Sequence, residues 1–169
     1  MTYTWHAIDG RMAELCDECG FDARELTGGT DEAARLDTAY ADLERHLDHP
    51  DAGRRPAPET WSAREYVDHC VEVAGALLEF ACSTAGVTTP EPPADLAGCR
   101  RAIADVVPAF TTAQRAEVLP DTYPQPVTVE WLVRHLLHDT EHHVLDVRRG
   151  YATLAMGDFP EVSFRGSPG

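Results

Sequence analysis

The sequence is poor in positive charge and contains no long apolar run. It carries 14 lysine and arginine residues against 29 aspartate and glutamate residues, a formal net charge of −15 at pH 7. A surface of this sign repels phosphate backbones and anionic lipid headgroups, which excludes nucleic acid and membranes as expected partners. No apolar run reaches the roughly 18 residues of a membrane span, and residues 1–16 lack the basic and apolar regions of a secretory leader. We therefore expect a cytoplasmic protein.

The cysteine content is far below that of a disulfide scaffold, and the count is odd. Five cysteines without an export signal predict reduced thiols rather than a disulfide framework. Cys16 and Cys19, followed by Gly20, resemble half of a zinc knuckle, in which two thiolates converge. No second Cys-x-x-Cys follows, so the alternatives are a turn with free thiols, a disulfide, or a metal site completed by ligands such as His6 or by a partner subunit. The other cysteines are predicted to be packing residues: Cys70, Cys82 and Cys99.

The length and composition fit one domain. The chain has 169 residues, of which 43% are apolar, enough for a sizeable core, and we expect residues 1–169 to form a single domain. Apolar residues recur at helical spacing in four segments separated by proline-rich stretches. Helices are expected over 31–48, 62–85 and 94–118, and from the capping residue Thr128 to about Gly150. Pro108 is expected to kink the third of them.

These segments predict an all-α four-helix bundle with an irregular N-terminal segment and a short C-terminal tail. Because the connections are long, one of the first two is expected to cross over, which makes the second and fourth helices neighbours. The tail carries Phe159, Val162 and Phe164. These residues would serve a homodimer interface or pack on their own domain.

Four histidines fall within nine residues, in the segment 134–149, RHLLHDTEHHVLDVRR. His135, His138 and His142 share one face of the predicted helix, whereas His143 points elsewhere. Imidazoles one turn apart can hold one cation from a helix surface. The alternatives are a solvated face and a hydrogen-bonded network of buried histidines. We take a metal site as the leading hypothesis.

A second informative segment begins with a helix start. Ser62 and Glu65 have the spacing of a capping box, and His69 follows on the same face as Glu65 and Glu72. The rest of this helix supplies apolar packing, so His69 is predicted to point inward. Paired with the later histidines, it becomes a plausible third ligand.

Two motifs together resemble the DinB-like metalloprotein superfamily. They are W-S-x-x-E-x-x-x-H, present as WSAREYVDH at 61–69, and H-D-x-x-H-H-x-x-D, present as HDTEHHVLD at 138–146. The resemblance implies a four-helix bundle in which one histidine of the second helix and two of the last hold a divalent metal. It maps the ligands onto His69, His138 and His142, with His135 as a second candidate. Zinc is the expected metal, and nickel, iron or manganese would also suit such a site.

The resemblance also implies chemistry. Members of this family include thiol-dependent S-transferases and maleylpyruvate isomerase, which use mycothiol, bacillithiol or glutathione. We expect a metal-dependent transferase or isomerase that acts on a small electrophile with a low-molecular-weight thiol. From their positions on the two helices, Glu65 and Glu72 are candidates for proton transfer, and Asp139 and Asp146 for orienting imidazoles. The candidates for binding an anionic substrate or thiol carboxylate are Arg149, which we favour, and Arg148.

Two alternatives stay open at this stage. The first is a metal-dependent hydrolase or lyase that activates water and needs no thiol. The second is a bundle that binds a metal or a small ligand without turnover. Arg149 would then only complement the dipole at the end of its helix.

Overall fold

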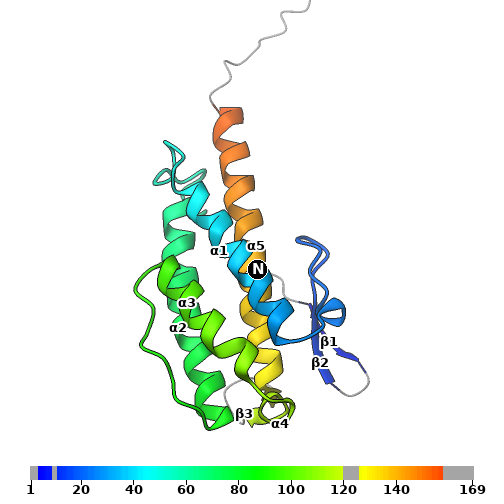
Figure 1. Cartoon of the computed structure of the whole chain (residues 1–169). Helices are drawn as coiled ribbons and strands as arrows, with labels where there is room; N and C mark the ends of the chain where they lie inside the picture. The colour runs from blue at the N-terminus through cyan, green and yellow to red at the C-terminus, as the bar shows by residue number, and fades with distance from the viewer. Residues whose placement is uncertain (1–3, 9–10, 120–125, 158–169) are drawn as a thin grey trace, which may run out of the picture.

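Four long helices form the body of the molecule (Figure 1). The computed structural model describes residues 4–8, 11–119 and 126–157. The helices are α1 (Gly29–His46), α2 (Ala63–Ala85), α3 (Leu96–Val106) and α5 (Val129–Gly157). Both α1 and α2 pack against α3 and α5 but touch each other little, so they lie on a diagonal of the bundle. The all-α bundle is confirmed, and the connection over residues 47–62 crosses over. The chain between α3 and α5 also crosses over, because these two helices lie on the other diagonal.

Helix α2 begins and ends where its sequence signals predict. The Ser62 side chain accepts a hydrogen bond from the Glu65 backbone N–H, and the Glu65 carboxylate accepts one from the Ser62 N–H at 2.9 Å. These two bonds satisfy donors that every helix start leaves without a partner. The helix ends at Gly86, whose φ of 66° lies in the left-handed region.

The third helical segment differs from the prediction. Instead of one kinked helix over 94–118, α3 ends at Val106, the turn η2 (Val107–Ala109) contains Pro108, and the short helix α4 (Thr112–Arg115) follows. Proline has no N–H to continue the helical hydrogen bonds. Thr111 then starts a new helix by accepting a bond from the Gln114 N–H, so the chain turns here rather than bending within one helix.

Helix α5 begins as predicted and runs further. Oγ1 of Thr128 accepts a hydrogen bond from the Trp131 N–H at 3.1 Å, which confirms the predicted cap. The helix continues past Gly150 to Gly157, because Leu154 is buried and the Tyr151 hydroxyl donates to the His46 carbonyl at 2.6 Å. The predicted interface residues of the tail lie outside the described residues: Phe159, Val162 and Phe164.

The N-terminal segment is not irregular. Strands β1 (Thr4–Ile8) and β2 (Arg11–Leu15) pair antiparallel, with Thr4 opposite Leu15, and the turn η1 (Ala23–Glu25) follows. A second short ladder joins β3 (Val118–Leu119) to β4 (Val127–Thr128). The five-residue strands were missed because so short a run carries little periodic signal. Strand β2 contacts α5, and this contact positions the loop that follows it beside the histidine-rich stretch.

The core lies between the helices and takes most of its large side chains from α1, α2 and α5. Three cysteines are fully buried in it, as predicted: Cys70, Cys82 and Cys99. Within the described part of the chain, no helix combines the length and apolar character that crossing a bilayer requires.

Candidate metal centre

The histidine-rich stretch of α5 presents side chains of ligand type, His and Asp, to two different neighbours. His138 and His142, one turn apart, face the loop that carries Cys16 and Cys19. The pair displaced by one residue, Asp139 and His143, faces His69 of α2. One residue corresponds to about 100° of rotation around the helix, so two interleaved pairs at i and i+4 point in different directions.

The first group, the His/Asp site, consists of His69, Asp139 and His143. One nitrogen or oxygen atom from each lies within 4.8 Å of the others. Nε2 of His69 is 3.8 Å from Oδ2 of Asp139, and Nε2 of His143 is 3.5 Å from Oδ1 of the same carboxylate. Asp139 and His143 are buried, and the His69 side chain is 29% exposed. The group therefore opens to solvent on the α2 side.

Asp146 fixes the orientation of the His143 ring. Its Oδ2 lies 3.1 Å from Nδ1 of His143, and this contact directs Nε2 toward Asp139 and His69. Burial opposes the charged form of His143, but the Asp139 and Asp146 carboxylates outweigh it and raise its pKa to about 9. Burial is also the main influence on His69, and it lowers the pKa of that imidazole. A carboxylate on the far nitrogen of a histidine is the usual support of a metal-ligating imidazole.

Aromatic rings border the open side of the His/Asp site. The Trp61 ring centroid lies 5.1 Å from that of His69, and the Tyr66 ring lies 5.0 Å from that of His143. Trp61 is 38% exposed. An exposed indole beside a half-exposed imidazole supplies an apolar surface at which a small molecule can reach the site.

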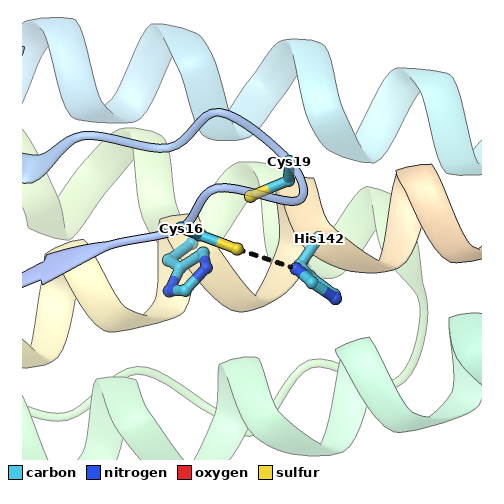
Figure 2. A group of neighbouring side chains, drawn as sticks. Cys16, Cys19 and His142 are labelled. Atoms are coloured by element: carbon cyan, nitrogen blue, oxygen red, sulfur yellow. Dashed lines mark hydrogen bonds between the residues drawn. The ribbon is translucent and has the colours of Figure 1, made fainter. Parts of the chain in front are cut away.

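The second group, the Cys/His cluster, consists of Cys16, Cys19, His138 and His142. Figure 2 shows both sulfur atoms directed toward the same space beside His142, with Sγ of Cys16 3.5 Å from Nδ1 of His142. Cys16, His138 and His142 are buried. Burial opposes ionisation of Cys16, but hydrogen bonds from the Cys19 backbone and the His138 side chain lower its pKa to about 6.

The structure divides the three predicted ligands between these two groups. His69 belongs to the His/Asp site, whereas His138 and His142 belong to the Cys/His cluster. Among the described residues, no group within 4.8 Å unites the three. The alternative ligand His135 contacts Glu14 instead, with Nδ1 2.7 Å from Oε1. That these side chains bind metal stays a prediction.

Two of the other predicted site residues are engaged in ion pairs. The Arg55 guanidinium and the bonds from Ser62 lower the pKa of Glu65 to about 2, so its carboxylate serves the helix cap. Arg149 donates to Glu18 at 2.8 Å, next to Cys19. Their functional roles stay predictions.

Glu72 lies further along α2. It is exposed and lines a surface groove between α2 and the segment Thr89–Pro93. Its role in proton transfer also stays a prediction.

The sequence prediction did not include Asp139 and His143 among the metal ligands. Helical periodicity correctly separated His143 from the stripe of the other three histidines, but it gave His143 no partner and Asp139 only an orienting role. The available signal was their spacing of four residues, which places the two side chains on one face. Glu14 was not identified, because a single acidic residue near the N-terminus has no motif of its own.

Comparison with known proteins points to one family. No curated protein and no solved structure shows a significant match to the chain. Residues 35–147, well over half of the chain, match the DinB superfamily. The match contains all three residues of the His/Asp site, on two neighbouring helices of the bundle. The chain therefore belongs to the DinB superfamily.

Proposed function

We propose that this protein is a metal-dependent thiol S-transferase or isomerase. It would act on a small electrophile and use a low-molecular-weight thiol. In this proposal the His/Asp site holds a divalent ion through His69, Asp139 and His143. The observation that carries the proposal is the meeting of these three donors from two helices within 4.8 Å, with one side open to solvent. Three protein ligands with an open position are the arrangement of catalytic rather than structural zinc sites.

The donor set fits such an ion. Two imidazoles and one carboxylate suit zinc, and also iron, nickel or manganese. When bound, the ion would lower the pKa of a coordinated thiol or water and so supply a nucleophile at neutral pH.

The residues around the His/Asp site orient one of its ligands and enclose its open side. Asp146 holds the His143 ring through Nδ1, which keeps Nε2 available to the site. Trp61 and Tyr66 shield the His/Asp site on the side where His69 is half exposed. Their rings can pack against the apolar part of an electrophile. Arg149 pairs with Glu18 beside the Cys/His cluster, so the proposal assigns it no contact at the His/Asp site.

The test combines metal analysis with turnover. Protein purified without an affinity tag is analysed for metal and then assayed with a panel of small electrophiles, with and without mycothiol, bacillithiol or glutathione. The variants are His69→Ala and the matched control His49→Ala, in which the histidine removed is exposed and belongs to neither group. We expect thiol-dependent turnover that falls more than about a hundredfold in His69→Ala and stays unchanged in His49→Ala.

The outcomes separate the alternatives. Turnover that needs the metal but no thiol would contradict the transferase assignment and favour a hydrolase or lyase. A wild-type protein that binds metal at His69 without turning over any substrate would support a binding protein. Metal content and turnover that survive His69→Ala would overturn the His/Asp site as the catalytic centre.

A further inference from the structure

We propose that the Cys/His cluster is a second metal site, a closed centre that holds zinc and fastens the N-terminal segment to α5. Its ligands are two thiolates and two imidazoles: Cys16, Cys19, His138 and His142. The proposal goes beyond the function proposed above and does not depend on it. The two cysteines also lie outside residues 35–147, the part of the chain that matches the DinB superfamily.

The geometry of the donors fits a tetrahedral ion. Bonds of about 2.3 Å from zinc to sulfur and about 2.0 Å from zinc to nitrogen place the ligand atoms roughly 3.3–3.8 Å apart. The four donor atoms of the cluster lie within 4.8 Å of one another, and Sγ of Cys16 lies 3.5 Å from Nδ1 of His142. Small rotations of the side chains suffice to bring all four to bonding distance.

The loop that carries the thiols is already folded as a knuckle. The Gly20 N–H donates to the Cys16 carbonyl and the Cys16 N–H donates to the Phe21 carbonyl, both at 2.9 Å. Gly20 has a φ of 77°, and a Cβ atom added there would meet no neighbour, so backbone conformation rather than space favours glycine. This turn reverses the chain and brings both sulfur atoms to one side (Figure 2).

The ring of His138 is held for ligation. Its Nδ1 lies 2.9 Å from Oε2 of Glu14, a carboxylate that is 1% exposed. The other ring nitrogen, Nε2, is therefore the one available to the group that contains Cys16 and Cys19. The Phe21 ring stacks on the imidazole at 4.7 Å with an interplanar angle of 12°. A carboxylate behind the histidine fixes its tautomer and raises its basicity toward a metal. Glu14 lies on β2, so the hairpin supplies the support and the following loop supplies the ligands.

A contact at the surface holds the same loop. Arg149 of α5 pairs with Glu18, which lies between the two cysteines. The loop is thus attached to α5 on both sides of the cluster, by Glu14 in the interior and by Glu18 at the surface. Two thiolates would balance the charge of a divalent ion, which makes its burial tolerable. Because the four ligands fill a tetrahedral shell, the site is structural rather than catalytic.

The experiment uses cobalt as a spectroscopic probe. The full-length protein is stripped of metal under reducing conditions and titrated with Co²⁺. Thiolate ligands give cobalt a ligand-to-metal charge-transfer band that histidine and carboxylate ligands do not. We expect this band to reach its maximum by about two equivalents of added Co²⁺ per chain, because the His/Asp site also takes the ion, and to disappear when Zn²⁺ is added.

Three variants locate the site. The double variant Cys16→Ser plus Cys19→Ser should lose the charge-transfer band and about one equivalent of zinc per chain. His69→Ala, which alters only the His/Asp site, should keep the band, and so should Cys82→Ala, which removes a buried thiol outside the cluster. These variants make failure of the second site distinguishable from failure of the proposed catalytic site.

A measurement on the unaltered chain covers the case in which the double variant does not fold. In the zinc-loaded wild-type protein, Cys16 and Cys19 should resist alkylation and become reactive after chelation, as read by peptide mass spectrometry. Equal reactivity before and after chelation would overturn the proposal, as would the absence of a charge-transfer band in the wild type or a disulfide between the two cysteines in freshly purified protein.

Discussion

The two candidate metal sites share one stretch of helix α5 and differ in what faces them. The Cys/His cluster uses His138 and His142 and is covered by a loop of the N-terminal segment. The His/Asp site uses the neighbouring residues Asp139 and His143, and α2 covers it only in part. One site has four donors and a closed surface, and the other has three donors and an open side. Adjacent residues of one helix can therefore serve structure and chemistry separately.

Asp146 is the point at which the two sites meet. Its Oδ2 contacts Nδ1 of His143 at 3.1 Å, and its Oδ1 lies 3.8 Å from Nε2 of His142. Each site also has support of its own, Glu14 behind His138 and the aromatic rings of Trp61 and Tyr66 beside the open side. The two sites are thus expected to respond differently to most substitutions and together to a change at Asp146.

The largest contrast is expected in stability. Removing both loop thiols with Cys16→Ser plus Cys19→Ser opens a long chain loop. A disulfide that closes such a loop contributes about 2–4 kcal/mol, and we expect a zinc bridge to contribute on the same scale. The corresponding fall in Tm is roughly 5–15 °C, measured by calorimetry on zinc-loaded protein. His69→Ala should change Tm much less, because the His69 side chain is half exposed. Chelation of the wild type removes metal from both sites and should lower Tm at least as much as the double substitution does. An unchanged Tm after chelation would contradict the assignment of a stabilising metal to the Cys/His cluster.

Asp146→Asn should lower the metal affinity of both sites, but by different factors. Loss of a carboxylate that orients a ligating histidine lowers metal affinity by about 10–100-fold, and this effect is expected at the His/Asp site, where the contact is short. The effect at the Cys/His cluster should be smaller, since the contact with His142 is longer. Competition with a chromophoric chelator measures both affinities. The control is Asp42→Asn, which alters an acidic residue paired with Arg148 on the outside of the bundle.

Glu65→Gln separates a capping role from a catalytic one. A glutamine at this position can still accept a hydrogen bond from the Ser62 N–H and complete the capping box. We therefore expect turnover to stay within about tenfold of the wild-type rate, because loss of a general acid or base costs roughly 10²–10⁴-fold. A loss in that larger range would assign proton transfer to Glu65 after all. Ser62→Ala, which removes the cap itself, should cost about 1 kcal/mol of stability without changing the chemistry.

The smallest effect concerns pH and a histidine outside both sites. Burial lowers the pKa of His46, and the charge of Arg148 lowers it further. The unfolded chain then holds this proton more tightly than the folded protein, so His46 destabilises the fold as the pH drops below about 6.5 toward its folded pKa. In metal-free protein, Tm of His46→Gln should decline less than that of the wild type between about pH 8 and pH 5.5. Parallel curves for the two proteins would contradict this assignment.

Much of the fold could be predicted because its signals are local. The capping box at Ser62 and the cap at Thr128 set two helix starts, and helical periodicity separated His143 from the other histidines of its stretch. Errors arose where non-local contacts decided the outcome. Helix α5 extends past Gly150 because Tyr151 and Leu154 pack on other parts of the bundle, and no pattern in the segment itself records those contacts.

The candidate site shows the same division. By itself the sequence determined which residue types are available and, through the period of the helix, that His138 and His142 point one way and Asp139 and His143 another. Only the tertiary structure decided that Cys16 and Cys19 approach the first pair and His69 the second. The physical reason is that helix phase depends on hydrogen bonds between near neighbours in the chain. The choice of partner instead depends on how the N-terminal hairpin and α2 pack against α5, which involves contacts across more than a hundred and about seventy residues of sequence, respectively.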